Sequence, residues 1–236
     1  MRKQIYSLIL TGSVLLLMTS CAKDTKEIMP LPTPAPTPAP LEANASYRMI
    51  ITGTWSMPQH TVPAGNHFTN FVGMVHSPSA YIYHLGTPAS LGVENVAEIG
   101  NDVALNSEMD TYINSGKALN KFSVTLPGIT GSATALINLS AQHSLVSFES
   151  MIAPSPDWFA GLDSYNLVQG GKWVTDITFN IAGFDAGTEE GDVFGYTNPA
   201  TNPQQNVGVL WPGNASVIAN GNAVIAPFAT VRFIKQ

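Results

Sequence analysis

Carboxylates are concentrated in two short segments of the chain, SPDWFAGLDSYNL (155–167) and FDAGTEEGDVF (184–194). Between Asp157 and Asp192 there are seven acidic residues and one basic residue, whereas the rest of 46–236 holds six acidic and five basic residues. Carboxylate oxygens bind hard cations such as Ca²⁺, which takes about 6–8 oxygen ligands. A local excess of acids therefore indicates either a cation site or an exposed acidic face.

The first segment places one carboxylate among bulky side chains. Asp157 follows Pro156, whose fixed φ limits the backbone, and precedes Trp158 and Phe159. Because large aromatic rings are driven into a core, we expect both rings to pack inward and to hold Asp157 in place. The alternative is a turn acid whose carboxylate caps nearby backbone amides.

The second segment has the composition of a turn. Gly187 lies between Asp185 and Glu189, and a glycine there lets the backbone curl so that the two acids converge. The remaining acids of the two segments are expected to be solvated side chains near the site: Asp163, Glu190 and Asp192.

Other chemistries have little support in the sequence. There is no HExxH pair, GxSxG elbow, phosphate loop, dinucleotide fingerprint or CxxC, and His60 and His76 are better explained as structural side chains bonded to the backbone. Paired carboxylates for glycoside hydrolysis could come only from scattered acids such as Glu94, Glu98 or Glu149. No basic patch exists, which argues against nucleic-acid binding. We therefore do not expect an enzyme.

The elements that must position the acids are mostly short strands. The region 46–236 has few charges and many turn-forming residues, and alternation is clearest in KWVTDITFNI (172–181). A stretch without β-branched runs, between Gly92 and Gly116, favours a short helical insertion. Many strands without regular α/β alternation predict an all-β fold, an antiparallel β-sandwich. The other expected strands are 47–55, 121–126, 134–139, 145–152 and 228–235.

The N-terminus resembles that of an exported lipoprotein. Arg2 and Lys3 precede a short apolar stretch that ends at Thr19-Ser20-Cys21, which predicts a lipoprotein signal peptide over 1–20 and lipidation of Cys21. The alternative is an ordinary thiol in a signal peptide. Cys21 is the only cysteine, so an internal disulfide is excluded. A diacylglycerol plus an N-acyl chain would anchor the protein stably to a membrane.

Residues 21–45 contain the lipidated terminus and a proline-rich linker. Prolines alternate with small or apolar residues from Pro30 to Pro40, a pattern that favours an extended polyproline II spacer of about 37 Å. Ala22 after the modified cysteine favours the outer membrane of a Gram-negative cell envelope. We expect the folded domain, 46–236, to face the periplasm or the cell surface.

Several motifs occur in an order that is specific. SMIAPSPDWFAGLDSYNL (150–167), Trp173 and FDAGTEEGDVF (184–194) follow GTWS (53–56) and GTPASLGVENVAEIG (86–100). This set resembles the spondin domain, the N-terminal module of F-spondin that also occurs in bacterial lipoproteins. The resemblance covers residues 47–195 well and is thin from 196 to 236.

The resemblance implies a C2-like β-sandwich that binds one Ca²⁺ near loops at one edge. By motif position its carboxylate ligands carry over to Asp157, Asp185 and Glu189. Glu189 departs from the family pattern, in which that position holds a shorter Asp, so its coordination is the least defined. The implied function is an adhesion or interaction module that recognises a glycan, a matrix component or a protein.

The alternative function is a calcium-dependent hydrolase that acts on an extracellular polymer. It would require two opposed carboxylates in a cleft away from the calcium. One further residue is a candidate for surface contact: Trp211, in GVLWPGNAS, lies beyond the good match to the family. The other three tryptophans fit the expected core: Trp55, Trp158 and Trp173.

Overall fold

The computed structural model describes residues 40–236, so the predicted signal peptide, Cys21 and most of the linker lie outside the described part. The principal strands form one antiparallel sheet in the order β4-β3-β6-β7-β10-β12-β1-β5. The strands are β1 (Asn44–Gly53), β2 (His67–Phe68), β3 (Phe71–His76), β4 (Ala118–Val124), β5 (Ser132–Ser140), β6 (Leu145–Ala153), β7 (Trp158–Asn166), β8 (Val168–Gln169), β9 (Lys172–Trp173), β10 (Asp176–Asp185), β11 (Gly208–Val209) and β12 (Ala229–Lys235). The helices are α1 (Leu91–Ile99) and α2 (Val103–Asn114).

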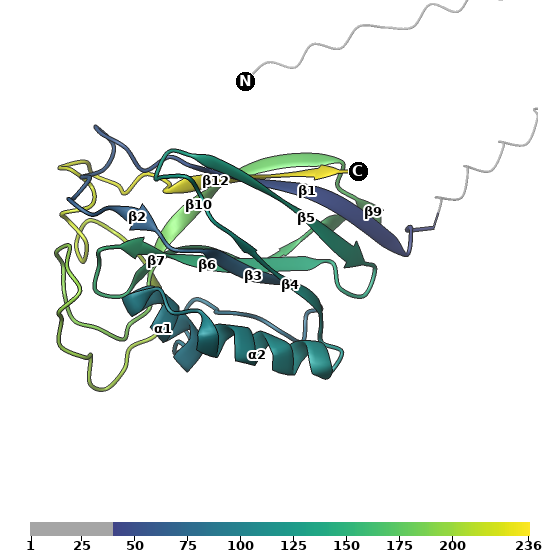
Figure 1. Ribbon diagram of the computed structural model, residues 1–236, viewed down its shortest axis with the longest axis horizontal. Helices are drawn as coiled ribbons and strands as arrows, with labels where there is room; N and C mark the ends of the chain where they lie inside the picture. The colour runs from purple at the N-terminus through teal and green to yellow at the C-terminus, as the bar shows by residue number, and fades with distance from the viewer. Residues whose placement is uncertain (1–39) are drawn as a thin grey trace, which may run out of the picture. The chain divides into compact units, whose positions relative to one another are not determined.

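Strand β10 joins the two layers of the sandwich. Its first part, residues 176–181, pairs with β12, and its last part, residues 182–185, pairs with β7. The layers are therefore β10-β12-β1-β5 above and β4-β3-β6-β7 below, as Figure 1 shows. On the open side, Asn120 Nδ2 of β4 donates to the Asn138 carbonyl of β5 at 2.9 Å, so the sheet is nearly closed. The predicted antiparallel all-β fold with a helical insertion is confirmed.

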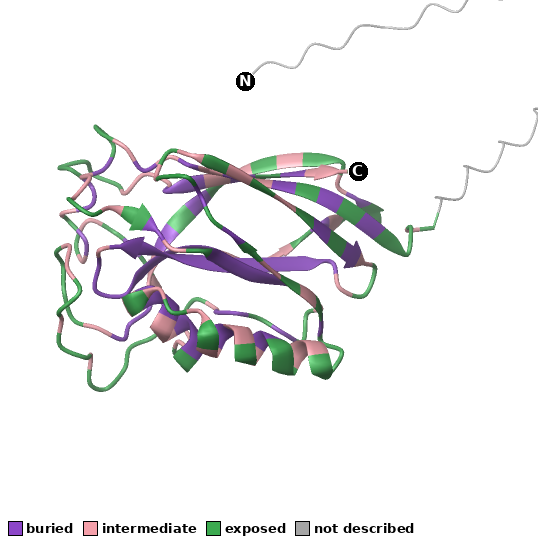
Figure 2. Cartoon of the chain, in the orientation of Figure 1, coloured by how far each residue is buried: buried purple, intermediate pink, exposed green. Residues whose placement is uncertain are grey.

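The main core lies between the layers. Strand β1 alternates buried and exposed positions, since one face packs inward and the other meets solvent. Strand β6 is buried at every position (Figure 2), because the helices cover its outer face. Among the largest fully buried side chains in this core are Trp55, Trp158, Phe148 and Phe233.

The two helices cover the lower layer as one unit. Ser90 caps α1 by accepting from Val93 N at 3.3 Å, and Gly100 ends α1 in the left-handed conformation at φ 67°. Glu108 of α2 accepts from Ser90 Oγ at 2.7 Å and from the Gly92 amide at 2.8 Å. These bonds tie the start of α1 to α2, and the apolar faces of both helices then form a second core against the sheet.

The structure differs from the expected elements in several ways. Strands β3 and β7 and the short strands β2, β8 and β11 were not expected, and the expected strand 172–181 is divided into β9 and β10. Strand β1 begins at Asn44, before the expected domain boundary at 46. Trp158 and Phe159 are both buried, but they open β7 and their side chains point to opposite faces. Trp158 packs between the layers and Phe159 packs under the helices. The expectation that both rings pack inward is therefore confirmed, although the two rings enter different cores.

Glu149 of β6 is an unusual buried acid. It is fully buried under the helices, and within residues 40–236 neither carboxylate oxygen has a hydrogen-bond partner. Burial, with a smaller contribution from Glu108, raises its pKa well above 4.5. Since the folded state holds this proton more tightly than the unfolded state, folding takes up a proton above pH 4.5.

We expect Glu149→Gln to remove this proton uptake. As pH rises from 5 to 8, the free energy of unfolding of the wild type should fall relative to that of the variant. The fall should be up to about 1.4 kcal/mol per pH unit until the pH reaches the pKa of Glu149 in the folded state. Urea unfolding at several pH values measures the difference, with Glu94→Gln on the partly exposed face of α1 as the matched control. Parallel pH profiles for the wild type and Glu149→Gln would contradict the prediction.

Candidate cation site and adjoining cleft

Asp157 lies immediately before β7 and is fully buried. Its Oδ2 accepts from the Thr188 amide at 2.7 Å, the Glu189 amide at 3.1 Å and Thr188 Oγ1 at 3.3 Å. Its Oδ1 is buried without a hydrogen-bond partner in the described part of the chain. The carboxylate therefore caps backbone amides, the alternative raised from the sequence, and those amides belong to the second acidic segment.

Asp185 lies beside Asp157 at the end of the neighbouring strand. It is opposite Trp158 in the β7–β10 register, and the Ala186 amide donates to the Asp157 carbonyl at 3.1 Å. Its Oδ1 accepts from the Gly187 amide at 2.8 Å, and its Oδ2 accepts from Asn214 Nδ2 at 3.3 Å. The pairing of β7 with β10 thus brings the two predicted aspartates together.

Gly187 makes the turn between the acids possible. Its φ is 73°, and an added Cβ would lie 2.7 Å from the Gln205 carbonyl oxygen. A side chain here would be both strained and in collision with backbone. The Gln205 amide donates to the Gly187 carbonyl at 2.8 Å, which closes the later loop onto this turn. The predicted curl of the backbone at this glycine is confirmed, but the Glu189 carboxylate bonds Asn198 and does not meet that of Asp185.

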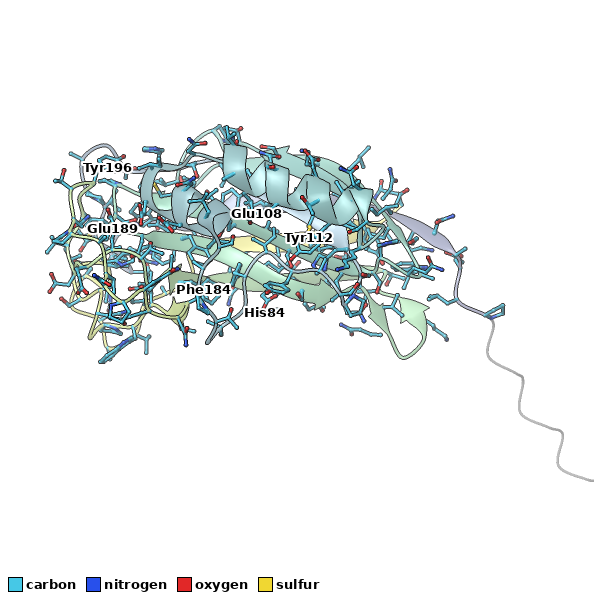
Figure 3. All side chains as sticks on the ribbon, turned by 90° about the horizontal axis from the view of Figure 1, so that it is seen from below. His84, Glu108, Tyr112, Phe184, Glu189 and Tyr196 are labelled. Carbon is cyan, nitrogen blue, oxygen red and sulfur yellow. The ribbon has the colours of Figure 1, made fainter. Side chains whose placement is uncertain are left out.

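Glu189 is placed differently from the aspartates. Its backbone amide contacts Asp157, but its Oε2 accepts from Asn198 Nδ2 at 3.3 Å. Figure 3 shows Glu189 at the loop end of the molecule, on the same side as Tyr196. Within residues 40–236 no group of three or more His, Cys, Asp or Glu side chains is arranged to hold a metal ion. The structure therefore brings Asp157 and Asp185 together and leaves the Glu189 side chain turned away.

Burial and mutual repulsion make these acids reluctant to ionise. Burial, followed by the charge of Asp157, raises the pKa of Asp185 to about 6. Burial also raises the pKa of Asp157, against the opposing effect of its hydrogen bonds. The pKa of Glu189 is raised by burial first, and then by Glu98 and Asp157. None of the ion pairs in the described residues involves Asp157, Asp185 or Glu189.

The donor set fits a hard cation in part. Two adjacent carboxylates, one with a buried oxygen that lacks a partner, offer oxygen ligands without a compensating positive charge. Glu98, near the end of α1, was considered from the sequence only for glycoside chemistry and not as part of a cation site. Burial raises the pKa of Glu98, and the charges of Glu94 and Asp157 add to this effect.

The other residues named from the sequence have structural roles. His60 Nε2 is 2.9 Å from the Ala226 carbonyl, and His76 Nδ1 is 2.9 Å from the Ser77 carbonyl, as expected for backbone-bonded histidines. Asp163 is not simply solvated, because its Oδ2 lies 2.7 Å from His84 Nδ1. The two remaining acids of the two acidic segments are exposed, in agreement with the expectation: Glu190 and Asp192.

A polar cleft of about 320 Å³ adjoins the acids. Asp185 and Glu189 line one part of it, and Trp211, Gln205 and Asn214 line another. Trp211 is 61% exposed, in agreement with the expected surface role, whereas Trp55, Trp158 and Trp173 are buried. No helix within the described residues is long and apolar enough to cross a membrane.

The fold and site together define an all-β sandwich module with helices on one layer and an acidic loop site at one end. The family model described as Spondin_N matches residues 45–216, and the chain belongs to this family. It is 32% identical over 208 residues to rat Spondin-2, covering 81% of this chain and 62% of that protein.

Two further relatives agree with this assignment. Human Spondin-2 is 34% identical over 190 residues, covering 75% of this chain and 56% of the relative. Chicken Spondin-1 is 30% identical over 172 residues, covering 69% of this chain and 21% of the relative. The chain thus spans less than two thirds of the length of each of these relatives.

We expect Asp157→Ala to release the 187–189 turn. It would leave two amides and one hydroxyl without their acceptor, and each unsatisfied buried donor costs about 1–3 kcal/mol. Asp157→Asn keeps one acceptor oxygen and should cost less. Amide hydrogen exchange at Thr188 and Glu189, measured beside urea unfolding, should show protection lost in the Ala variant only. Unchanged exchange in Asp157→Ala would contradict the proposed link between the segments, and Asp192→Ala is the exposed control.

Proposed function

We propose that this chain is a calcium-binding interaction module, anchored by a lipid on Cys21 to the outer membrane of the cell envelope and displayed on a proline-rich spacer. Its partner would be a glycan, a matrix component or a protein, and no nucleic acid. The observation that carries the proposal is the buried Asp157 next to the partly buried Asp185 in a chain of the spondin family.

Calcium accounts for features that the hydrogen bonds alone leave unexplained. Among residues 40–236 the Asp157 Oδ1 has no hydrogen-bond partner, and partial burial beside Asp157 raises the pKa of Asp185. A divalent ion would supply the charge that two neighbouring carboxylates lack. Asp157 and Asp185 would hold the ion, and Glu189 would join them only after its side chain leaves Asn198.

An interaction role is better supported than hydrolysis. Of the three acids that the sequence offered for glycoside chemistry, Glu149 is fully buried, and Glu94 and Glu98 lie four residues apart on α1. Glu108, whose charge contributes to the raised pKa of Glu149, accepts a hydrogen bond from the Gly92 amide at the start of α1. A calcium-dependent hydrolase would need two opposed carboxylates open to a polymer, and these acids do not offer them.

Calcium should raise the melting temperature of the purified chain from Cys21 onward after removal of metal with EDTA. At 1 mM Ca²⁺ and a Kd of about 0.1 mM the stabilisation is about 1.4 kcal/mol, which corresponds to roughly 3–6 °C for a domain of this size. Mg²⁺ should have a smaller effect because it demands stricter octahedral geometry.

Asp157→Ala and Asp185→Ala should both abolish the calcium-induced rise, and Asp192→Ala should retain it. Calorimetry at several calcium concentrations gives the rise directly. The calcium proposal would be wrong if the wild type showed no rise at millimolar calcium, or if Asp192→Ala lost the rise together with the other two variants.

The state of Cys21 can be read directly because it is the only cysteine. If the thiol carries a lipid, the wild type purified from its native envelope should extract with membranes. It should also fail to react with a maleimide after denaturation. Cys21→Ser should lose membrane association. Stoichiometric maleimide labelling of the wild type would show that the anchor is not a thioether and would overturn this part of the proposal.

A further inference from the structure

Trp211 is an exposed aromatic ring on a fixed turn. The turn is held by buried Leu210 and Ala215 on either side and by the bond from the Ala215 amide to the Trp211 carbonyl at 3.0 Å. An added Cβ at Gly213 would lie 1.9 Å from the indole, so the ring rests directly against the glycine backbone. One side of the indole is thus supported by its own turn, while 61% of the residue remains exposed.

The turn of Trp211 is connected to the acidic pair. Asn214 Oδ1 accepts from the Trp211 amide at 3.0 Å, and Asn214 Nδ2 donates to Asp185 Oδ2 at 3.3 Å. One side chain therefore sets both the position of the indole and the environment of the Asp185 carboxylate. The two lie along the same cleft of about 320 Å³, which is within the size range of small-ligand pockets.

The rest of the lining offers free hydrogen-bonding groups on a fixed backbone. The backbone N–H of Gln205 donates to the Gly187 carbonyl, and the backbone of Asn206 forms an isolated β-bridge with that of Pro88. Both side chains are exposed, and neither forms a hydrogen bond with another residue in 40–236. A primary amide presents two donors and one acceptor oxygen, so this pair can match groups that both donate and accept.

The charges of the cleft limit the class of ligand. Asp185, Glu189 and Glu190 line it and no lysine or arginine does, which disfavours phosphorylated, sulfated or carboxylated ligands. The carboxylates would attract a cationic peptide. However, Asp185 and Glu189 already accept hydrogen bonds from the protein, so these carboxylates are partly occupied. The exposed indole and the free side-chain amides suit a ligand that has an apolar face and hydroxyl groups around its edge.

We propose that this cleft binds a neutral saccharide, with one sugar ring stacked on Trp211 and its hydroxyl groups bonded by the amides of Gln205 and Asn206. This inference rests on the proposed interaction function and names its partner class. The indole supplies apolar contact for the C–H face of the ring, and the polar lining fixes the orientation of the hydroxyls. Calcium at the aspartates would order the 187–189 turn, to which the loop that carries Gln205 is bonded, so binding would be tighter with calcium present.

Isothermal titration calorimetry on the chain from Cys21 onward tests the proposal, in a detergent without a sugar headgroup and with 2 mM Ca²⁺. The neutral probes are cellohexaose, maltohexaose, mannohexaose and N-acetylchitohexaose. A heparin hexasaccharide and hexalysine are the anionic and cationic probes. At least one neutral probe should bind with a Kd of about 1 mM or lower, and Trp211→Ala should weaken it by about tenfold or more. Leu136→Ala, which removes a 72% exposed side chain on β5, should bind as the wild type does.

The outcomes separate this inference from the calcium proposal. Trp211→Ala should keep the calcium-induced rise in melting temperature, because Trp211 is not one of the carboxylates. Saccharide binding that depends on Trp211 would sustain the inference even if calcium did not raise the melting temperature. The missing rise would then refute only the calcium site. No binding of any neutral probe, equal affinity in Trp211→Ala, or preferential binding of hexalysine or heparin would overturn the saccharide assignment.

Discussion

The loop end of this domain depends on one buried carboxylate that joins two distant segments. Asp157 Oδ2 accepts from Thr188 and Glu189, about thirty residues further along the chain, and so fixes the turn after β10. The same turn holds the loop that follows it, because the backbone N–H of Gln205 donates to the Gly187 carbonyl. Without this acceptor the buried amides would be unsatisfied, so the acidic site and the adjoining cleft share one structural origin.

The rest of the fold brings Asp157 to that position. Because β10 pairs first with β12 and then with β7, its last residue, Asp185, arrives beside the start of β7. Trp158 and Phe159 then fix that start from both faces of the sheet, one in each core. Phe159 contacts the rings of Tyr83 and Phe184 and belongs to the core that the two helices cover.

The sequence predicted the elements whose signals are local. Alternation located β10, candidate strands were also placed on β1, β4, β5, β6 and β12, and the lack of β-branched runs located the helices. Strand β6 was predicted although it is buried at all nine positions, whereas the shorter β3, FVGMVH, which is buried at all six, was not. The proximity of Asp157 and Asp185 followed from motif order, but the direction of the Glu189 side chain and the role of Asn214 depend on contacts between distant loops. Such contacts have no periodic signature.

The departure at Glu189 has a physical consequence for the site. An aspartate at this position would keep its carboxylate near the turn backbone, whereas the additional methylene lets Glu189 reach Asn198. The acids nearest the turn are then two instead of three, with raised pKa values caused first by burial. A site with two firm ligands and one movable ligand binds a cation more weakly than a preformed triad, because the third ligand must first give up its bond to Asn198. Weak binding suits a module whose calcium would order a partner surface, since ligand and ion then strengthen each other through the same turn.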